Sequence, residues 1–389
     1  MDIETAKRIL EEPEPFVAEQ WLRFLSDEQM ELEDNILNQV REDSDFQFHF
    51  VMGGAGTGKT QVLLLLAEDL KDAGLKVGYF TTQGVREMVE KAGLDMPKEN
   101  YFPGAVHLVD DPEEVGQVIE AYRRAKEHKA RALVVAIDPF QWTERTAFLK
   151  LATILGDHNP SEDILGRRNT LLKIQELLNG VKPQKHYLRT AYRQAKETGA
   201  GSVALSHSIF QRMNPYVADE KMTQFASITK PYVQNILNGL SHVSDGGSFQ
   251  VFENGNAMEL WKIVAKLAAR DDRWDWTNSI LFVSDGTLSD TSWEEFQIEI
   301  PGISDQSDFE KTSNVQSVLA SINARLVSFA NPSAVRGQEF QDVVICVSKN
   351  RWKQFKTAKV GMGGPEWESI MPIHTFTTRA IDSVQILVG

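Results

Sequence analysis

Apolar positions predict alternating strands and helices between residues 46 and 160. Phe46, Phe48 and Phe50 alternate with polar residues and lead into glycines, which is typical of a buried strand that ends in a loop. A helix is expected over 60–73, with Gly74 placed to end it. Further strands are expected at 76–82, 105–110, 132–138 and 151–157. This alternation predicts a parallel sheet covered by helices on both faces.

The remaining sequence predicts an acidic helical segment, a helical middle part and a second α/β unit. Ser26 is placed to start a helix in the first segment. Strands return at 249–253, 279–284, 324–329, 342–347 and 384–388. We therefore expect four parts, which are 1–45, 46–160, a linker with helical insertions at 161–245, and 246–389.

Composition and charge narrow the classes of protein. Hydrophobic residues make up 42% of the chain and charged residues 25%, as in globular domains. No apolar run reaches the roughly 18 residues of a membrane span, and Cys346 is the single cysteine. We expect no signal peptide, because the first residues lack a basic and apolar pattern. We expect a cytoplasmic protein with no membrane partner. The net charge of −14 is concentrated in residues 1–45. The total charge therefore does not exclude a basic groove for nucleic acid in the rest of the chain.

One segment matches a phosphate-binding loop. The pattern G-x-x-x-x-G-K-S/T is filled by Gly53, Gly54, Ala55, Gly56, Thr57, Gly58, Lys59 and Thr60. Glycines let backbone N–H groups point at phosphate oxygens, the lysine reaches the outer phosphates, and the threonine hydroxyl binds Mg²⁺. The magnesium carboxylate should end a buried strand, and Asp138 fits that position. We expect ATP and Mg²⁺ as cofactors.

Seven further segments follow a known motif order. They are residues 25–29, 79–82, 138–141, 156–160, 188–194, 335–340 and 374–380. With the phosphate loop, this series resembles superfamily 1 helicases of the UvrD/Rep type and their smaller Schlafen-like relatives. The resemblance implies an α/β fold of two RecA-like P-loop NTPase lobes, with parallel sheets, small helical insertions and ATP between the lobes.

The resemblance also assigns roles to individual residues. Gln29 is the expected reader of adenine, and Gly337 and Glu339 join residues 53–60 as nucleotide contacts. The expected catalytic residues are Lys59, Asp138, Gln141, Arg193 and Arg379, and the expected metal ligands are Thr60 and Asp138. Thr81 and Thr82 are the expected contacts to single-stranded nucleic acid.

Two positions depart from the family pattern. Pro139 stands where the family has the glutamate that polarises water, and Pro160 stands where it has a glutamine. Proline has no side-chain acceptor and cannot serve as general base. Glu144 and Asp157 are the nearby carboxylates that would replace the glutamate. Hydrolysis is therefore expected to be slow, to use another residue or to need a partner.

A basic and aromatic segment follows the motif at 335–340. Arg351, Trp352, Lys353 and Phe355 combine cations with rings, as a track for single-stranded nucleic acid requires. The competing interpretation is a solvated loop with one buried tryptophan.

Three function classes remain. The main hypothesis is a nucleic-acid-dependent ATPase, a helicase or single-strand translocase that acts on single-stranded nucleic acid, with DNA favoured over RNA. The alternative is a hydrolysis-impaired ATP-binding switch or scaffold, which regulates a protein partner such as a nuclease or belongs to a larger complex. A metabolic P-loop kinase would explain the phosphate loop and none of the later motifs.

Overall fold

The chain forms two compact units. The computed structural model describes residues 25–43, 45–82, 86, 101–142, 146–161, 167–212, 230–237, 240–242, 245–269, 280–285, 324–336, 338–357 and 371–389. Unit 1 comprises residues 1–189 and 227–240, and unit 2 comprises 190–226 and 241–389. The chain therefore passes between the units three times, whereas the sequence predicts a single linker at 161–245 between the two α/β parts.

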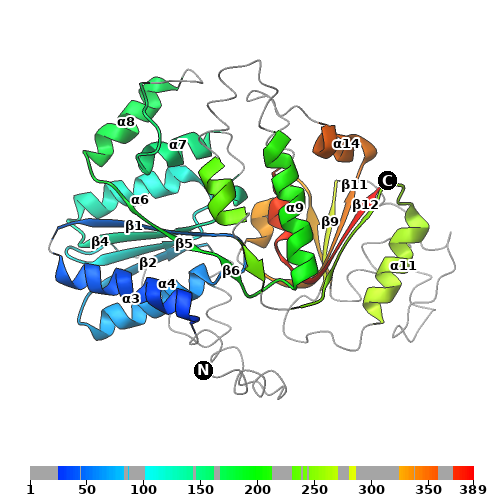
Figure 1. Ribbon diagram of the computed structural model, residues 1–389, viewed down its shortest axis with the longest axis horizontal. Helices are drawn as coiled ribbons and strands as arrows, with labels where there is room; N and C mark the ends of the chain where they lie inside the picture. Colours follow the sequence, from blue (N-terminus) through cyan, green and yellow to red (C-terminus); the bar gives the residue numbers. More distant parts are fainter. Residues whose placement is uncertain are drawn as a thin grey trace. The chain divides into compact units, whose positions relative to one another are not determined.

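Unit 1 is built on a five-stranded parallel sheet (Figure 1). Its strands are β1 (Gln47–Gly53), β2 (Val77–Thr81), β3 (Val106–Asp110), β4 (Ala132–Ile137) and β5 (Gln184–Leu188). They are ordered β2-β3-β4-β1-β5, and every neighbouring pair runs parallel. The carboxyl ends of all five strands therefore meet at one edge of the sheet, where ligands of open α/β sheets bind.

Helices cover both faces of this sheet. Helices α3 (Asp27–Glu42) and α4 (Lys59–Asp72) lie on one face, and α6 (Val115–Glu127), α7 (Ala147–Ile154) and α8 (Arg168–Leu178) lie on the other (Figure 1). Leu32, Ile36 and Val40 recur every four residues along α3 and join the buried core. The described residues of unit 1 also form two short helices, η1 (Pro139–Gln141) and η2 (Val233–Leu237).

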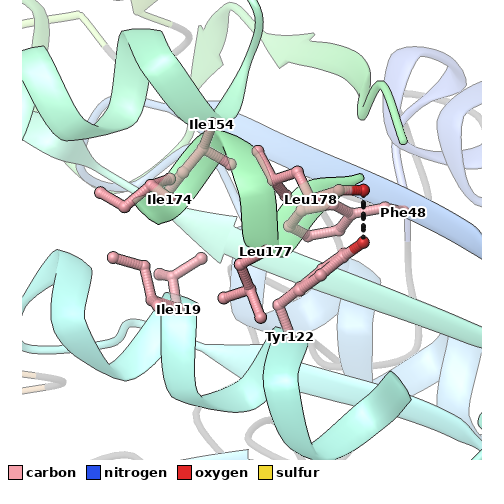
Figure 2. A pocket seen from close by; sticks show the side chains of 8 residues that line it. Phe48, Ile119, Tyr122, Ile154, Ile174, Leu177 and Leu178 are labelled. Carbon is pink, nitrogen blue, oxygen red and sulfur yellow. Dashed lines mark hydrogen bonds between the residues drawn. The ribbon is translucent and has the colours of Figure 1, made fainter. Parts of the chain in front are cut away.

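A small gap remains in the layer of α6, α7 and α8. Figure 2 shows Phe48, Ile119 and Ile174 around it. The Tyr122 hydroxyl donates a hydrogen bond of 3.1 Å to the carbonyl of Leu178 beside it. The cavity volume is about 10 Å³, which is at most the space of one water molecule. We therefore regard this gap as a packing feature and not as a ligand site.

Unit 2 contains a second five-stranded parallel sheet. Its strands are β8 (Ser248–Phe252), β9 (Ile280–Ser284), β10 (Ala324–Ser328), β11 (Phe340–Val347) and β12 (Ala380–Val388), ordered β10-β9-β11-β12-β8. The helices are α9 (Lys196–Arg212), α11 (Ala257–Ala268), η4 (Pro332–Val335), α14 (Lys349–Thr357) and α16 (Pro372–Thr377). Two short strands, β6 (Thr190–Ala191) and β7 (Ser241–His242), pair in parallel immediately after two of the crossings.

The predicted fold class, α/β with parallel sheets, is confirmed. The strand predicted at 151–157 is wrong, because residues 147–154 form helix α7. Leu151, Ala152 and Ile154 are all buried, and a short apolar run fits a buried helix as well as a strand. Strand β5 lies inside the stretch that was expected to be helical.

Candidate functional site

The phosphate loop joins β1 to α4 at the carboxyl edge of the first sheet. Gly56 and Gly58 have φ angles of 75° and 80°, a left-handed conformation that residues with a Cβ atom rarely adopt. The Lys59 ammonium donates to the carbonyls of Gly53 and Gly54 at 3.0 and 2.8 Å. The Thr57 hydroxyl donates to the Gly54 carbonyl at 3.0 Å. The loop thus has the curled backbone and following helix N-terminus that bind phosphate oxygens.

Gln29 holds the phosphate loop from helix α3. Its side chain is 2% exposed, and Nε2 donates to the Thr57 carbonyl at 2.9 Å. Its Oε1 accepts from the backbone N–H of Ser26 at 2.9 Å, while the Ser26 hydroxyl accepts from the Gln29 N–H at 3.3 Å. These last two bonds form a capping box at the start of α3. The residue expected to read adenine is therefore bonded to the loop backbone.

A segment that returns from unit 2 packs on the first half of the loop. A methyl group on Gly54 would lie 3.4 Å from the Leu240 side chain and 3.7 Å from the Ile236 carbonyl oxygen. In the same segment, the buried hydroxyl of Tyr232 donates to Asp157 at 3.3 Å. Asp157 also accepts from Lys185, so it is bonded within unit 1. Glu144, the other carboxylate considered as a substitute base, lies outside the described residues.

Asp110 at the end of β3 is the carboxylate beside the loop's threonine. It is 1% exposed, and the Tyr79 hydroxyl donates to its Oδ2 at 3.1 Å. Burial, and secondly the charge of Asp111, raise the pKa of Asp110 to about 7, although Thr60, Tyr79 and Lys59 act to lower it. Its Oδ1 is buried and has no hydrogen-bond partner among the residues that the structure describes.

These residues fit a magnesium ion. Mg²⁺ prefers hard oxygen ligands and usually takes one or two from the protein, with the rest from phosphate and water. The Asp110 carboxylate offers an oxygen that is otherwise unsatisfied, and the Thr60 hydroxyl lies next to this carboxylate. The sequence also predicts Thr60 as a metal ligand, but it pairs Thr60 with Asp138 and not with Asp110.

Asp138 instead caps the short helix η1. Its Oδ1 accepts from the Phe140 N–H at 3.1 Å, and its Oδ2 accepts from Gln141 Nε2 at 3.2 Å. Asp138 and Gln141, both predicted as catalytic residues, thus contact each other, following β4 at the carboxyl edge. Asp110 was not among the predicted site residues, although the apolar run before it ends in two carboxylates. Asp111 has a φ angle of 49°, which is uncommon outside glycine and is frequent at functional sites.

Three predicted motifs meet in unit 2. Arg193 Nε and Nη2 lie 2.6 and 2.5 Å from Glu339 Oε1. Gln194 Nε2 donates to the Thr377 carbonyl at 3.0 Å, and the Phe340 N–H donates to the Arg379 carbonyl at 3.0 Å. The motifs at 188–194, 335–340 and 374–380 therefore converge where β11 and β12 begin. Gly337 lies outside the described residues, and Arg379 is 3% exposed.

The predicted nucleic-acid residues are divided between core and surface. Trp352 and Phe355 on α14 are buried at 7% and 2% exposure, so their rings belong to the core and do not offer a stacking surface. Arg351 Nε donates to Asp285 at 3.1 Å, and its guanidinium lies 4.7 Å from the centre of the Phe329 ring. Lys353 is exposed.

Thr81 and Thr82 lie at the carboxyl edge of the first sheet. Thr81 is the register partner of Asp110 across the β2–β3 pair, and Thr82 follows it directly. The Thr81 hydroxyl oxygen is buried and lacks a hydrogen-bond partner among the described residues. The contact of Thr81 and Thr82 with single-stranded nucleic acid stays a prediction.

Comparisons with known proteins return solved structures only. No family model matches the chain, and no curated protein matches it. Pif1 helicase from Candida albicans is 11% identical, with a TM-score of 0.33, over 94% of this chain and 95% of that one. The Pyrococcus furiosus Hef helicase domain is 9% identical, with a TM-score of 0.31, over 92% and 95%. The Sulfolobus solfataricus SWI2/SNF2 ATPase core domain is 10% identical, with a TM-score of 0.29, over 92% and 84%.

All three TM-scores lie below 0.5, so the fold assignment rests on the strand order and the loop geometry of this chain. The first unit has the strand, glycine-rich loop and helix of a P-loop nucleotide-binding fold. Within the described ranges, no helix has both the length and the apolar character needed to span a membrane.

Proposed function

We propose that this chain is a Mg²⁺-dependent ATPase of the superfamily 1 helicase or translocase type, stimulated by single-stranded nucleic acid, DNA more than RNA. The observation that carries the proposal is the phosphate loop with the buried carboxylate of Asp110 beside Thr60. The ordered motif series supports the helicase type, because three of its members meet in unit 2. We place this activity in the cytoplasm.

Roles follow for the residues of the unit 1 site and, from the motif order alone, for two arginines of unit 2. Lys59 and the loop N–H groups bind the outer phosphates, and Thr60 and Asp110 hold Mg²⁺. The bound ion would neutralise charge on the phosphate oxygens. Asp111, whose carboxylate follows Asp110 in the chain, orients the attacking water and accepts its proton. Arg193 and Arg379 stabilise charge on the transferred phosphoryl group.

This assignment changes the significance of Pro139. Proline replaces the expected glutamate only if Asp138 is the metal ligand, and Asp138 is bonded to Phe140 and Gln141. With Asp110 as the ligand, Asp111 stands in the position of the base. The main argument for a hydrolysis-impaired switch is thereby removed, and that function becomes an outcome of the experiment below.

The test compares ATP turnover with and without single-stranded DNA and RNA. Lys59→Ala should abolish turnover, and Asp110→Asn should lower it by about 100-fold or more. Asp138→Asn, the matched control, should retain most of the activity. The reverse order of the two aspartate variants would return the metal site to Asp138. Tight ATP binding with negligible turnover under every condition would support a switch that regulates a protein partner, and absence of ATP binding would refute the proposal.

A further inference from the structure

We infer that Gln29 is a positioning residue for the phosphate loop and does not read the nucleotide base. The inference rests on the proposed nucleotide site in unit 1. The contact between α3 and the loop would then affect binding of the triphosphate group, which all nucleoside triphosphates share. Selectivity for adenine would then not depend on Gln29.

The first argument is the geometry of one peptide group. Gln29 Nε2 donates to the Thr57 carbonyl at 2.9 Å, in the peptide that links Thr57 to Gly58. In a trans peptide the carbonyl and the following N–H point in opposite directions. Fixing the Thr57 carbonyl toward α3 therefore turns the Gly58 N–H away from α3. Because the loop binds phosphate through its N–H groups, Gln29 orients one of the donors.

The second argument is that the Gln29 amide is buried and already bonded at both its nitrogen and its oxygen. Its Nε2 is bonded to Thr57 and its Oε1 to the Ser26 N–H, and the side chain is 2% exposed. One N–H and one oxygen lone pair remain, but they are buried with the side chain, so Gln29 would have to move to reach a base. That movement would take the donor from the Thr57 carbonyl and undo half of the capping box, and unmade buried hydrogen bonds are costly.

The third argument is the fit between Gln29 and Gly58. A Cβ atom on Gly58 would lie 2.0 Å from Gln29 Nε2, so the glutamine amide fills the space that a side chain would need. Gly58 also has a φ angle of 80° and is the N-cap of α4. The amide is therefore packed directly against the residue at which the loop becomes the helix.

The experiment measures Mg²⁺-dependent binding of ATP, GTP and tripolyphosphate to the full chain by calorimetry. Gln29→Met keeps the side-chain length and removes both the donor to Thr57 and the acceptor for Ser26, of which only the donor contacts the loop. We expect it to weaken all three ligands by a similar factor, about fivefold to tenfold for one lost hydrogen bond, with the ATP-to-GTP ratio unchanged. Lys59→Ala should remove binding of all three ligands.

Gln47→Met is the matched control. Gln47 Nε2 donates to the Gln39 carbonyl at 3.2 Å and its Oε1 is bonded to His49, so Gln47 ties the same helix to β1, near the opposite end of the helix. This variant should loosen the same helix and leave the three affinities unchanged. Gln29→Glu is the second variant, because it keeps an acceptor for Ser26 but cannot donate to Thr57. It should show the same loss across the series if Gln29→Met fails to fold.

Three results would overturn the inference. They are a loss for ATP alone, no loss for any ligand, and equal losses in the Gln29 and Gln47 variants. Failure of the proposed nucleotide site gives a different result, since the unsubstituted chain would then bind none of the three ligands. That result would also remove the basis of the inference.

Discussion

The Tyr79 hydroxyl and the Asp110 carboxylate are joined by a hydrogen bond of 3.1 Å inside the first sheet. Tyr79 is fully buried on β2, and Asp110 ends the neighbouring strand β3. The bond occupies Oδ2 and leaves Oδ1 as the oxygen that has no such bond among the described residues. Tyr79 lies on the strand that ends at Thr81. It thus orients the Asp110 carboxylate, which we propose as a metal ligand.

Tyr79→Phe should raise the Mg²⁺ concentration needed for half-maximal ATP turnover by about tenfold, because partners that orient a metal ligand contribute on that scale. Tyr122→Phe is the control, since it also removes one buried tyrosine hydrogen bond, to the Leu178 carbonyl. Its metal dependence should stay unchanged. Equal responses of the two variants would show that Tyr79 supports only the fold.

Arg193→Gln should lower ATP turnover by about 100-fold or more and leave ATP affinity within a few-fold, if the arginine acts on the transferred phosphoryl group. Glu339→Gln removes its partner in the ion pair and should act mainly on stability, by about 1 kcal/mol for a partly exposed pair. Steady-state kinetics and thermal unfolding of both variants test this. A large loss of ATP affinity in Arg193→Gln would contradict the role.

Trp352→Ala should destabilise the chain by about 3–5 kcal/mol, because it empties a buried ring position beside Phe355. Lys353→Ala should leave stability nearly unchanged, since Lys353 is exposed on the same helix. If α14 binds nucleic acid, Lys353→Ala weakens single-strand binding at low salt, which fluorescence anisotropy would measure. Unchanged binding would remove α14 from the nucleic-acid surface.

Glu33→Gln should stabilise the chain above neutral pH. Burial, and secondly the charge of Asp69, raise the pKa of Glu33 from 4.5 to about 8. The folded state keeps a proton that the unfolded chain releases above pH 4.5, so the stability of the native chain falls as the pH rises from 4.5 toward 8. Glutamine has no proton to lose, and we expect a gain of about 1–3 kcal/mol at pH 8.

Denaturant unfolding at pH 6.5, 7 and 8 measures this effect. Burial lowers the pKa of His49 from 6.5 to about 3, so His49 reduces stability only as the pH falls below 6.5. The chosen range therefore excludes its contribution. Glu31→Gln, an exposed position on the same helix, controls for the change in net charge. An equal gain in both variants would contradict the buried proton.

Local signals in the sequence were sufficient for the loop and its flanking elements. Glycines at fixed spacing followed by Lys59 and Thr60 need only adjacent residues to define a phosphate loop, and it lies between the expected strand and helix. Ser26 starts α3 through a capping box, which is also a local pattern. The converging motifs of unit 2 were named from their order along the chain.

The order of the strands within the sheet could not be predicted from such local patterns. Two apolar strands each lead into an aspartate, at Asp110 and Asp138, and periodicity does not say which one lies beside Thr60. Strand β5 was missed because residues 184–187 are exposed or partly exposed at the edge of the sheet, without a buried run. Gln29 was assigned by motif alone, which carries no information about bonds to Thr57.

The triple crossing of the chain has a consequence for biosynthesis. Leu240 packs near the phosphate loop, yet it follows residues 190–226 of unit 2 in the chain. During translation, the loop and all five strands of unit 1 emerge from the ribosome before the segment that covers Gly54, and residues of the other unit emerge in between. Neither unit can be completed before the other has begun, so the nascent chain must fold the two in an interleaved order.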